Sequence, residues 1–502
     1  MRKMAFRLAA LVTLSGLAGL GGAIAPFGMV GCASILGLEN TTLGSDPDVS
    51  GDGFVVRQTT GWIAADGGYV TWPSKLASQD ITVSVRNGTE FVASELRSQH
   101  IVDGTTVGLN FGSPAPGERY VAVQEGGIRT IYVVKGNHLD LGFDAVGRHD
   151  AVQAAAGLRL TAKGVSATDG GENEPESFLG GSLTLPLGKL AGTPPAWTIA
   201  QGSSAGPLRL LDRAKGDVAW VKREGPVAPS FLATVEGCTF PEQFQMLPGS
   251  EAHVEVTCGT APKRSVSLRT SLEAFRNLVA SAPEPDSAVV TLVQIPPGHR
   301  VLREQPATRV MGDLVGHGPV PLDAAPLDFD FVDPALPDWP LVATARIEFE
   351  SGGAAPFQTS FKVSRALRDG PLAPLVGPVR GVSIGTSDLL QPGAKIVGVG
   401  YTPTIVLVPP DTTPPLRAPT SYRLGIMAFD DRDGGPAGGF EFVTEIVTRG
   451  TEVVLPPGVV QAGKTHLLTV TAQYTESYSE EEPLRGRLPS GETTITTNVF
   501  AP

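Results

Sequence analysis

The chain has 502 residues, of which 41% are hydrophobic, 18% charged and 6% aromatic. Gly (61) and Pro (43) together make up about a fifth of it, against a usual share nearer ~12%. The apolar content excludes an intrinsically disordered chain, and the Gly and Pro content argues against a helix-rich enzyme. The length predicts about three domains.

The charge balance bears on the partners. Lys and Arg number 39 against 51 Asp and Glu, which gives a net charge of −12 at pH 7. Nucleic-acid binding needs basic side chains concentrated on one surface, and no window of the sequence holds such a cluster. We therefore expect no nucleic-acid partner.

Residues 1–31 have the pattern of a secretory signal peptide. Basic residues at the start, among them Arg2 and Arg7, precede an apolar run from Leu8 to Val30. An uncleaved transmembrane anchor is the alternative, because a run of this length spans a bilayer. The glycines of the run and Pro26 disfavour that alternative.

The end of this segment predicts a lipid anchor. Met29-Val30-Gly31-Cys32 resembles a bacterial lipobox, which implies lipidation of Cys32 and attachment to a membrane. Cleavage after Ala25, in Ala23-Ile24-Ala25, is the alternative. Ala33 stands where an Asp would resemble an inner-membrane retention signal, so an outer-membrane or cell-surface location is expected. Residues 32–56 are predicted to form a flexible tether.

Cys238 and Cys258 are the other two of the three cysteines. An even pair in an exported chain predicts a disulfide. Two cysteines cannot complete a structural zinc site, and no cofactor is expected. Closing a loop of about twenty residues stabilises a fold by about 3 kcal/mol.

Alternating apolar and polar residues are the recurring signal after the tether. They occupy Ile81–Val85, His253–Thr257, Ile347–Phe349 and Phe357–Val363. A period of two predicts strands with one solvent-exposed face, which are typical of antiparallel sheets. The sequence therefore predicts an all-β fold of tandem antiparallel, immunoglobulin-like β-sandwich domains.

The central segment, residues 151–372, is predicted to be β-rich with one short helix and the disulfide. Thr270 and Glu273 form a capping box, and Pro283 ends the helix. The apolar residues at helical spacing are Leu268, Leu272, Phe275, Leu278 and Val279. We expect this stripe to pack on a sheet.

Residues 57–150 are predicted to form a small first module. A strand at 107–111, a Pro- and Gly-containing turn at 114–117 and a strand at 120–123 resemble the carboxypeptidase regulatory-like β-sandwich. A plain β-hairpin is the alternative reading of the same residues.

Residues 378–502 resemble a fibronectin type III domain, a seven-stranded sandwich. The resemblance rests on the order and spacing of the segments 404–410, 422–426, 451–458, 463–472 and 493–500. Leu407 replaces the usual Trp of this family. His466 replaces the Tyr that the family usually has at the corner, the turn that precedes the penultimate strand. The lost phenol hydroxyl predicts a module less stable by about 1 kcal/mol.

The whole plan resembles the multi-β-sandwich lipoproteins of predatory soil bacteria such as myxobacteria. The resemblance rests on the lipobox, on the C-terminal module, and on Leu139–Asp144 with Gly147, Arg148 and Asp150.

Gly202-Ser203-Ser204-Ala205-Gly206 matches the G-x-S-x-G elbow of α/β-hydrolases. Pro207 follows at once and the flanks read as β, so a turn of small residues is the favoured interpretation. The histidines that could act as a base in a hydrolase are His253, His299, His317 and His466, and nothing pairs any of them with Ser204.

Two segments are weak calcium candidates. Asp48, Ser50 and Asp52 resemble the start of a calcium loop, but Thr59 stands where that loop needs Glu. The second candidate is a group of acidic residues before Gly434, which also reads as a hairpin turn. Its members are Asp430, Asp431 and Asp433.

We expect a non-catalytic, lipid-anchored protein of the cell envelope that displays β-sandwich domains to bind a protein or a glycan. Trp62 and Trp72 would suit stacking on a sugar, although two Trp in a β domain more often pack in the core. The alternatives are a secreted hydrolase with its site in the central segment and a periplasmic structural or assembly factor.

Overall fold

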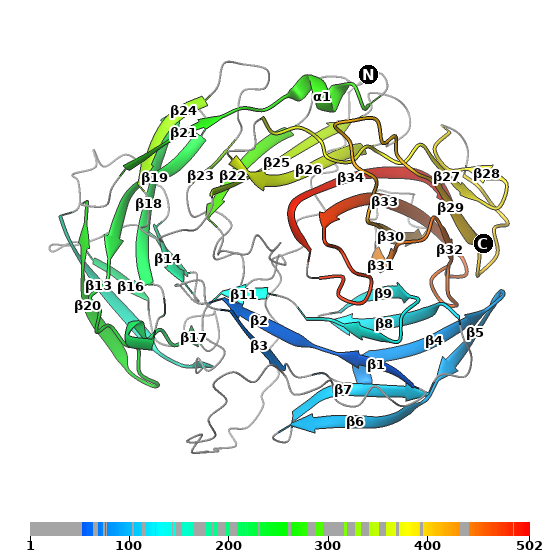
Figure 1. The fold of residues 1–502 in the computed structure, drawn as a ribbon, viewed down its shortest axis with the longest axis horizontal. Helices are drawn as coiled ribbons and strands as arrows, with labels where there is room; N and C mark the ends of the chain where they lie inside the picture. The colour runs from blue at the N-terminus through cyan, green and yellow to red at the C-terminus, as the bar shows by residue number, and fades with distance from the viewer. Residues whose placement is uncertain are drawn as a thin grey trace. The chain divides into compact units, whose positions relative to one another are not determined.

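The computed structural model describes most of residues 53–502. The longer stretches outside the described residues are 1–52, 147–152, 165–176, 189–195, 200–207, 280–286, 295–315, 319–326, 333–340, 351–357 and 431–440, and shorter gaps lie between them. Most of the described residues are in β-strands and very few are helical, which confirms the all-β expectation (Figure 1).

The N-terminal module is a sandwich of two sheets. One sheet has the order β10-β1-β7-β6. In the other sheet β4 lies between β5 and β8, and β8 also pairs with β9. The bounds are β1 Gly53–Arg57, β4 Ile81–Asn87, β5 Glu90–Ser94, β6 Leu96–Val102, β7 Thr105–Gly112, β8 Arg119–Glu125, β9 Ile128–Val134 and β10 His138–Asp140.

Alternation places the apolar side chains of this module between its two sheets. Phe54 and Leu109 from one sheet and Val83 and Val121 from the other are buried in one cluster. Two expectations are corrected here. Residues 53–56 belong to β1 and not to the tether, and β7 and β8 lie in different sheets, so the hairpin interpretation of residues 107–123 is wrong.

A small sheet accompanies this module. Its order is β11-β2-β3, with β2 at Thr59–Ile63, β3 at Tyr69–Pro73 and β11 at Asp144–Val146. Trp62 and Trp72 lie on β2 and β3, opposite Val70 and Thr60.

The central segment holds most of the remaining strands. They are β12 Gln153–Ala154, β13 Gly157–Lys163, β14 Ser177–Gly181, β15 Leu185–Gly188, β16 Ala196–Ile199, β17 Leu208–Arg209, β18 Ala219–Ala228, β19 Phe231–Thr239, β20 Glu251–Cys258, β21 Lys263–Leu268, β22 Ser287–Gln294, β23 Gly316–Gly318, β24 Leu327–Val332, β25 Leu341–Glu350 and β26 Gln358–Ala366. Short 3-10 turns lie at η1 Ser78–Asp80 and η2 Arg213–Lys215.

Two separate hydrophobic clusters stabilise this segment. One is built around Leu158, Val221 and Val256, and the other around Phe231 and Phe361. Long antiparallel pairings such as β25–β26 and β22–β25 carry the second cluster.

The predicted helix is present but shorter than its apolar stripe. The helix α1 spans Leu272–Arg276, and its N-cap is Ser271, which makes no side-chain capping bond. The capping box at Thr270 is therefore wrong, and Leu268 belongs to β21. Phe275 is fully buried against Phe361, with ring centroids 5.3 Å apart, so the expected packing of the helix on a sheet is confirmed.

The C-terminal module is also built of two sheets. One has the order β28-β27-β29-β32, and in the other β31 pairs with β30, β30 with β33 and β33 with β34. The bounds are β27 Gly381–Ile384, β28 Ser387–Asp388, β29 Thr404–Val408, β30 Ser421–Asp430, β31 Glu441–Thr448, β32 Glu452–Val454, β33 Lys464–Glu476 and β34 Arg487–Phe500. Leu407 fills the core between the sheets.

The modules are joined by strand pairing. In the N-terminal module β9 runs parallel to β31 of the C-terminal module, with Thr130 opposite Glu445 and Tyr132 opposite Val447. The C-terminal strand β34 pairs with β26 of the central segment. One sheet therefore runs through all three parts, and residues 52–502 form one compact unit.

The N- and C-terminal modules also share their cores. Tyr120 and Ile131 of the N-terminal module are buried in the cluster of the C-terminal module, and Val447 is buried in the N-terminal cluster. The Thr444 hydroxyl donates to the carbonyl of Arg129 at 2.9 Å. These contacts make the two modules one packed body.

Candidate functional site

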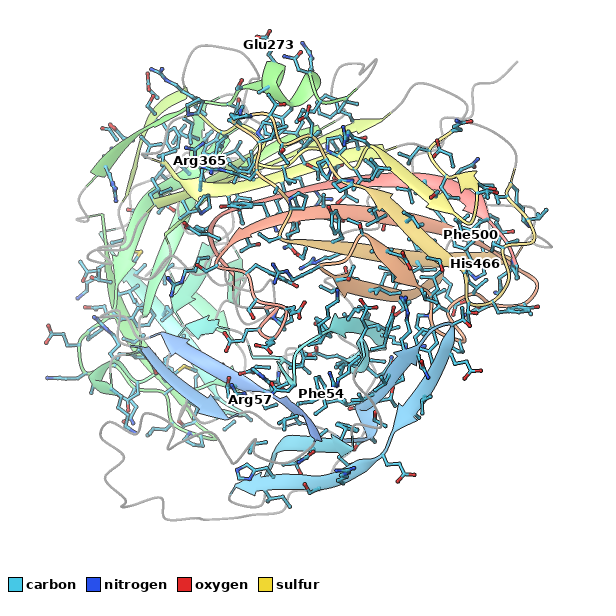
Figure 2. All side chains as sticks on the ribbon, turned by 45° about the vertical axis from the view of Figure 1, so that its right-hand side comes forward. Phe54, Arg57, Glu273, Arg365, His466 and Phe500 are labelled. Atoms are coloured by element: carbon cyan, nitrogen blue, oxygen red, sulfur yellow. A yellow bond between two sulfur atoms is a disulfide. The ribbon has the colours of Figure 1, made fainter. Side chains whose placement is uncertain are left out.

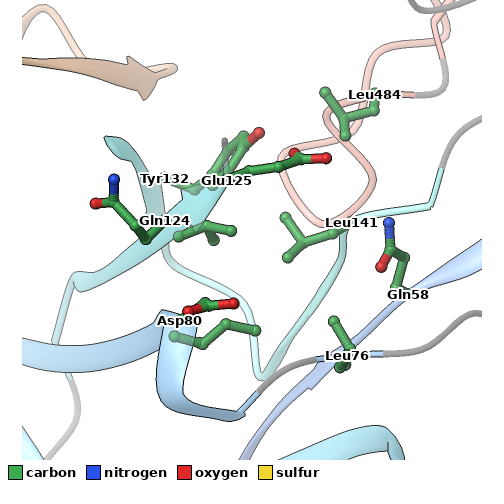
Figure 3. A pocket seen from close by; sticks show the side chains of 10 residues that line it. Gln58, Leu76, Asp80, Gln124, Glu125, Tyr132, Leu141 and Leu484 are labelled. Atoms are coloured by element: carbon green, nitrogen blue, oxygen red, sulfur yellow. The ribbon is translucent and has the colours of Figure 1, made fainter. Parts of the chain in front are cut away.

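A small hollow opens where the N-terminal module meets the connection between β33 and β34. Its volume is about 150 Å³. Its floor is apolar and its rim carries amides and carboxylates, as Figure 3 shows. The residues that line the hollow are Gln58, Leu76, Asp80, Ile81, Val123, Gln124, Glu125, Tyr132, Leu141 and Leu484.

The chemistry of the hollow suits binding. Asp80, Glu125 and the two glutamines supply hydrogen-bonding groups around an apolar floor, the arrangement of many ligand sites. The lining contains no Ser, Thr, Cys or His, the side chains that usually provide an activated nucleophile or its base.

One wall of the hollow is fixed by the buried carboxylate of Asp140. The Thr59 backbone N–H donates to Oδ1 at 3.1 Å, the Thr59 hydroxyl to Oδ2 at 2.6 Å and the Gly142 N–H to Oδ1 at 2.8 Å. Arg57 Nε lies 3.4 Å from Oδ2. Asp140 therefore ties β1, β2 and the chain around Leu141 together. This gives Asp140, the first of the two acidic residues of Leu139–Asp144, a structural role.

The connection between β33 and β34 docks on the same module. The backbone N–H of Asp140 donates to the Glu481 carbonyl at 2.7 Å, and that of Lys135 donates to the Glu480 carboxylate at 3.2 Å. His138 Nδ1 lies 3.6 Å from Glu481 Oε1. We call Ser479–Leu484 the acidic strap. It brings Leu484 to the hollow.

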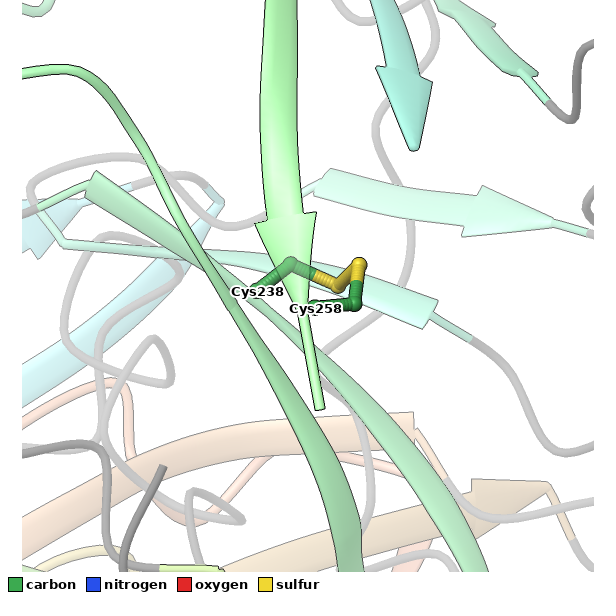
Figure 4. The surroundings of a disulfide bond; sticks show 2 residues. All are labelled: Cys238 and Cys258. Atoms are coloured by element: carbon green, nitrogen blue, oxygen red, sulfur yellow. A yellow bond between two sulfur atoms is a disulfide. The ribbon is translucent and has the colours of Figure 1, made fainter. Parts of the chain in front are cut away.

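The predicted disulfide between Cys238 and Cys258 is present, with an S–S distance of 2.05 Å (Figure 4). The two cysteines lie opposite each other on β19 and β20. These strands share only one further pair, Thr239 with Thr257. The disulfide therefore supplies much of what holds the two strands together.

The structure corrects the expectation for His466. The sequence predicts a lost hydrogen bond at this corner, but the backbone N–H of Gln461 donates to His466 Nε2 at 3.1 Å. The imidazole is fully buried and stacks on Phe500, with ring centroids 5.5 Å apart (Figure 2). A ring nitrogen thus makes a hydrogen bond to the backbone where a loss was expected.

Several predicted site residues lie outside the described residues. They are Cys32, Ser204, His299, Asp431 and Asp433, together with Asp48, Ser50 and Asp52. Asp430 ends β30, opposite Lys464. His317 lies in β23, and His253 on β20 is exposed, 3.7 Å from Glu251. Neither the hydrolase elbow nor the calcium candidates are therefore tested.

The described residues hold neither a metal-binding cluster nor a membrane-spanning helix. Nowhere in that part of the chain do three or more His, Cys, Asp or Glu side chains gather as a metal ion requires. No helix there has both the length and the apolarity to cross a bilayer.

Sequence reasoning missed the hollow and the acidic strap. The run Glu480-Glu481-Glu482 is visible in the sequence, but the Lys135 amide that it binds lies 345 residues away. Local patterns carry no information on such a contact.

Comparisons with known proteins add little. No protein family matches the chain, and no curated protein matches it. Among solved structures, a leucine-rich repeat protein from Bacteroides thetaiotaomicron is similar at a TM-score of 0.11 and 11% identity. The match covers 41% of this chain and 26% of that one. At this level the similarity carries no argument, so the function is argued from the chain itself.

Proposed function

We propose that the protein is a lipid-anchored component of the cell envelope that presents a β-sandwich body for binding a protein or a glycan. The disulfide carries this proposal, because such bonds persist in oxidising compartments outside the cytoplasm. Met29-Val30-Gly31-Cys32 supplies the anchor, which holds the protein at the outer membrane or cell surface.

The strand order of the C-terminal module supports a fibronectin type III-like assignment. A sheet of β28, β27, β29 and β32 faces a sheet of β31, β30, β33 and β34 across one core, and apart from the two-residue strand β28 the division is three strands against four. This is the division of strands in immunoglobulin-like sandwiches. His466, at the corner position, makes a bond to the chain upstream, as the family's Tyr does.

The hollow supports binding over catalysis. Its apolar floor and amide and carboxylate rim suit hydrogen bonding to a small polar group on a larger partner, such as one sugar ring or one side chain. The lining has no Ser, Thr, Cys or His, and its carboxylates, Asp80 and Glu125, are suited to accept hydrogen bonds from a sugar hydroxyl or an amide. We place the contact with the ligand there.

The anchor is tested in cells. With Cys32 present, globomycin should block processing of the precursor and the protein should fractionate with membranes. Cys32→Ala should abolish both the globomycin effect and the membrane association. The lipid anchor would be contradicted if processing is the same with and without globomycin, and the same in the unmodified protein and in Cys32→Ala.

Binding is tested separately with the soluble chain from Ser45 onward on glycan and peptide arrays. Binding that is lost in Gln124→Ala and Asp80→Ala, but kept in Asp388→Ala on an exposed turn, would support the hollow. Turnover of ester or peptide substrates that Ser204→Ala abolishes would instead favour the hydrolase.

A further inference from the structure

The hydrogen bond at the His466 corner fixes the protonation state of the imidazole. Nε2 accepts the backbone N–H of Gln461 at 3.1 Å, so in the folded protein this nitrogen carries no proton. A neutral imidazole has one donor and one acceptor nitrogen, which places the proton on Nδ1. A protonated ring has two donors and cannot make this bond.

The surroundings of the ring oppose a positive charge. The side chain is fully buried and lies against the Phe500 ring. The charged groups that act on it are Lys395, from the segment before β29, and Lys464, two residues earlier on β33, and both are cations. A charge placed on the imidazole is therefore both desolvated and repelled.

The corner is connected to the end of the chain. His466 pairs with Phe500 across β33 and β34. The Ile396 N–H donates to the Val499 carbonyl at 3.1 Å, and the Ala501 N–H donates to the Ile396 carbonyl at 2.8 Å. The segment after Ile396 exposes Val397 and Tyr401, with 68% and 56% of their surfaces accessible.

We propose that His466 is a pH-sensitive switch: protonation of its ring breaks the bond to Gln461 and releases the end of β34 together with the segment from Ile396 to Tyr401. This inference is independent of the lipid anchor and of the ligand. It concerns a conformational change within the C-terminal module in a mildly acidic environment.

The direction of the pH effect follows from linkage. Burial lowers the pKa of the His466 imidazole, the two lysines lower it further, and the Phe500 backbone acts in the opposite direction. A His with a depressed pKa in the folded state contributes stability that is fully present above its unfolded pKa of about 6.5. That stability is lost as the pH falls towards the depressed pKa.

The test is hydrogen exchange of the full chain in detergent at pH 7.5 and pH 5, corrected for the intrinsic exchange rates. We expect the Gln461 amide and residues 498–501 to lose protection at the lower pH, because a protonated ring can no longer accept the Gln461 N–H. In His466→Tyr, whose side chain at this position does not titrate in this range, protection of these residues should stay constant.

Equal losses of protection in both proteins, or no loss in either, would overturn the proposal. If His466→Tyr does not fold, the ring is titrated by NMR in the unmodified chain. A pKa at or above 6.5 for His466 would then contradict the switch, and a lower value accompanied by the loss of protection would support it.

Discussion

At the scale of single residues, buried polar groups in the N-terminal module serve to fix the chain. Asp140 is 1% exposed and accepts hydrogen bonds from Thr59 and Gly142. A buried donor that loses its acceptor costs roughly 1–3 kcal/mol. The carboxylate of Asp140 therefore contributes to folding through several donors at once.

Asp140→Ala should lower the free energy of unfolding by about 3 kcal/mol, because it leaves the Thr59 amide, its hydroxyl and the Gly142 amide without their acceptor. Urea denaturation measures the change. Asp388→Ala is the control, since its carboxylate accepts one bond at an exposed turn, and it should cost less than about 1 kcal/mol. Equal losses in the two variants would contradict a special role for Asp140.

At the scale of elements, two connections hold strands in place beyond their own pairing. The disulfide joins β19 to β20, which share two register pairs. The acidic strap, which is part of the β33–β34 connection, binds the turn between β9 and β10 and the start of β10. Each connection can be removed by changing one or two side chains.

Reducing the disulfide should lower the free energy of unfolding by about 3 kcal/mol, because the unfolded chain gains the freedom of a loop of about twenty residues. Urea denaturation with and without dithiothreitol measures it. The double variant Cys238→Ala, Cys258→Ala should unfold at the midpoint of the reduced protein and should not respond to dithiothreitol. A response of this variant would point to another cause.

Gly136→Ala should destabilise the docking of the acidic strap, because a Cβ at this position collides with the Glu481 carboxylate. We expect a loss below about 1 kcal/mol, because the carboxylate is the far end of a flexible side chain and can move aside at the expense of its contact with His138. Glu481→Ala in the same chain should recover most of it. Gly108→Ala is the control, since its Cβ would meet His100 at an ordinary 3.5 Å. Failure of Glu481→Ala to rescue Gly136→Ala would contradict the proposed contact.

The elements themselves were largely predictable. Alternation located β4, β20 and β26, because a strand with one buried face needs a period of two. The helix was predicted too long, because Leu268 matched the helical spacing while pairing with Leu327 in a sheet. The hydrogen bond that the His466 imidazole accepts could not be predicted, because it depends on the geometry of the folded chain.

At the scale of the whole molecule, the sequence predicts tandem domains, and the structure joins the first and last modules by β9 and β31. Thr130 and Glu445 are more than 300 residues apart in the sequence. The sequence of β9 or β31 alone does not distinguish a free edge strand of a sheet from one that pairs with another module. Such pairing depends on which edges meet when the chain closes, so periodicity cannot reveal it. The hollow and the acidic strap are consequences of the same contact.

The most direct test of this joined body is a cross-link between β9 and β31 in the Cys32→Ala chain. Thr130 and Glu445 are register partners, so Thr130→Cys with Glu445→Cys should form a disulfide on mild oxidation, detected by mass spectrometry of the digested protein. Thr130→Cys with Glu441→Cys, four residues out of register, is the control. We predict fast and nearly complete bonding in the first pair only. Equal or absent bonding in both pairs would contradict the joining of the two modules.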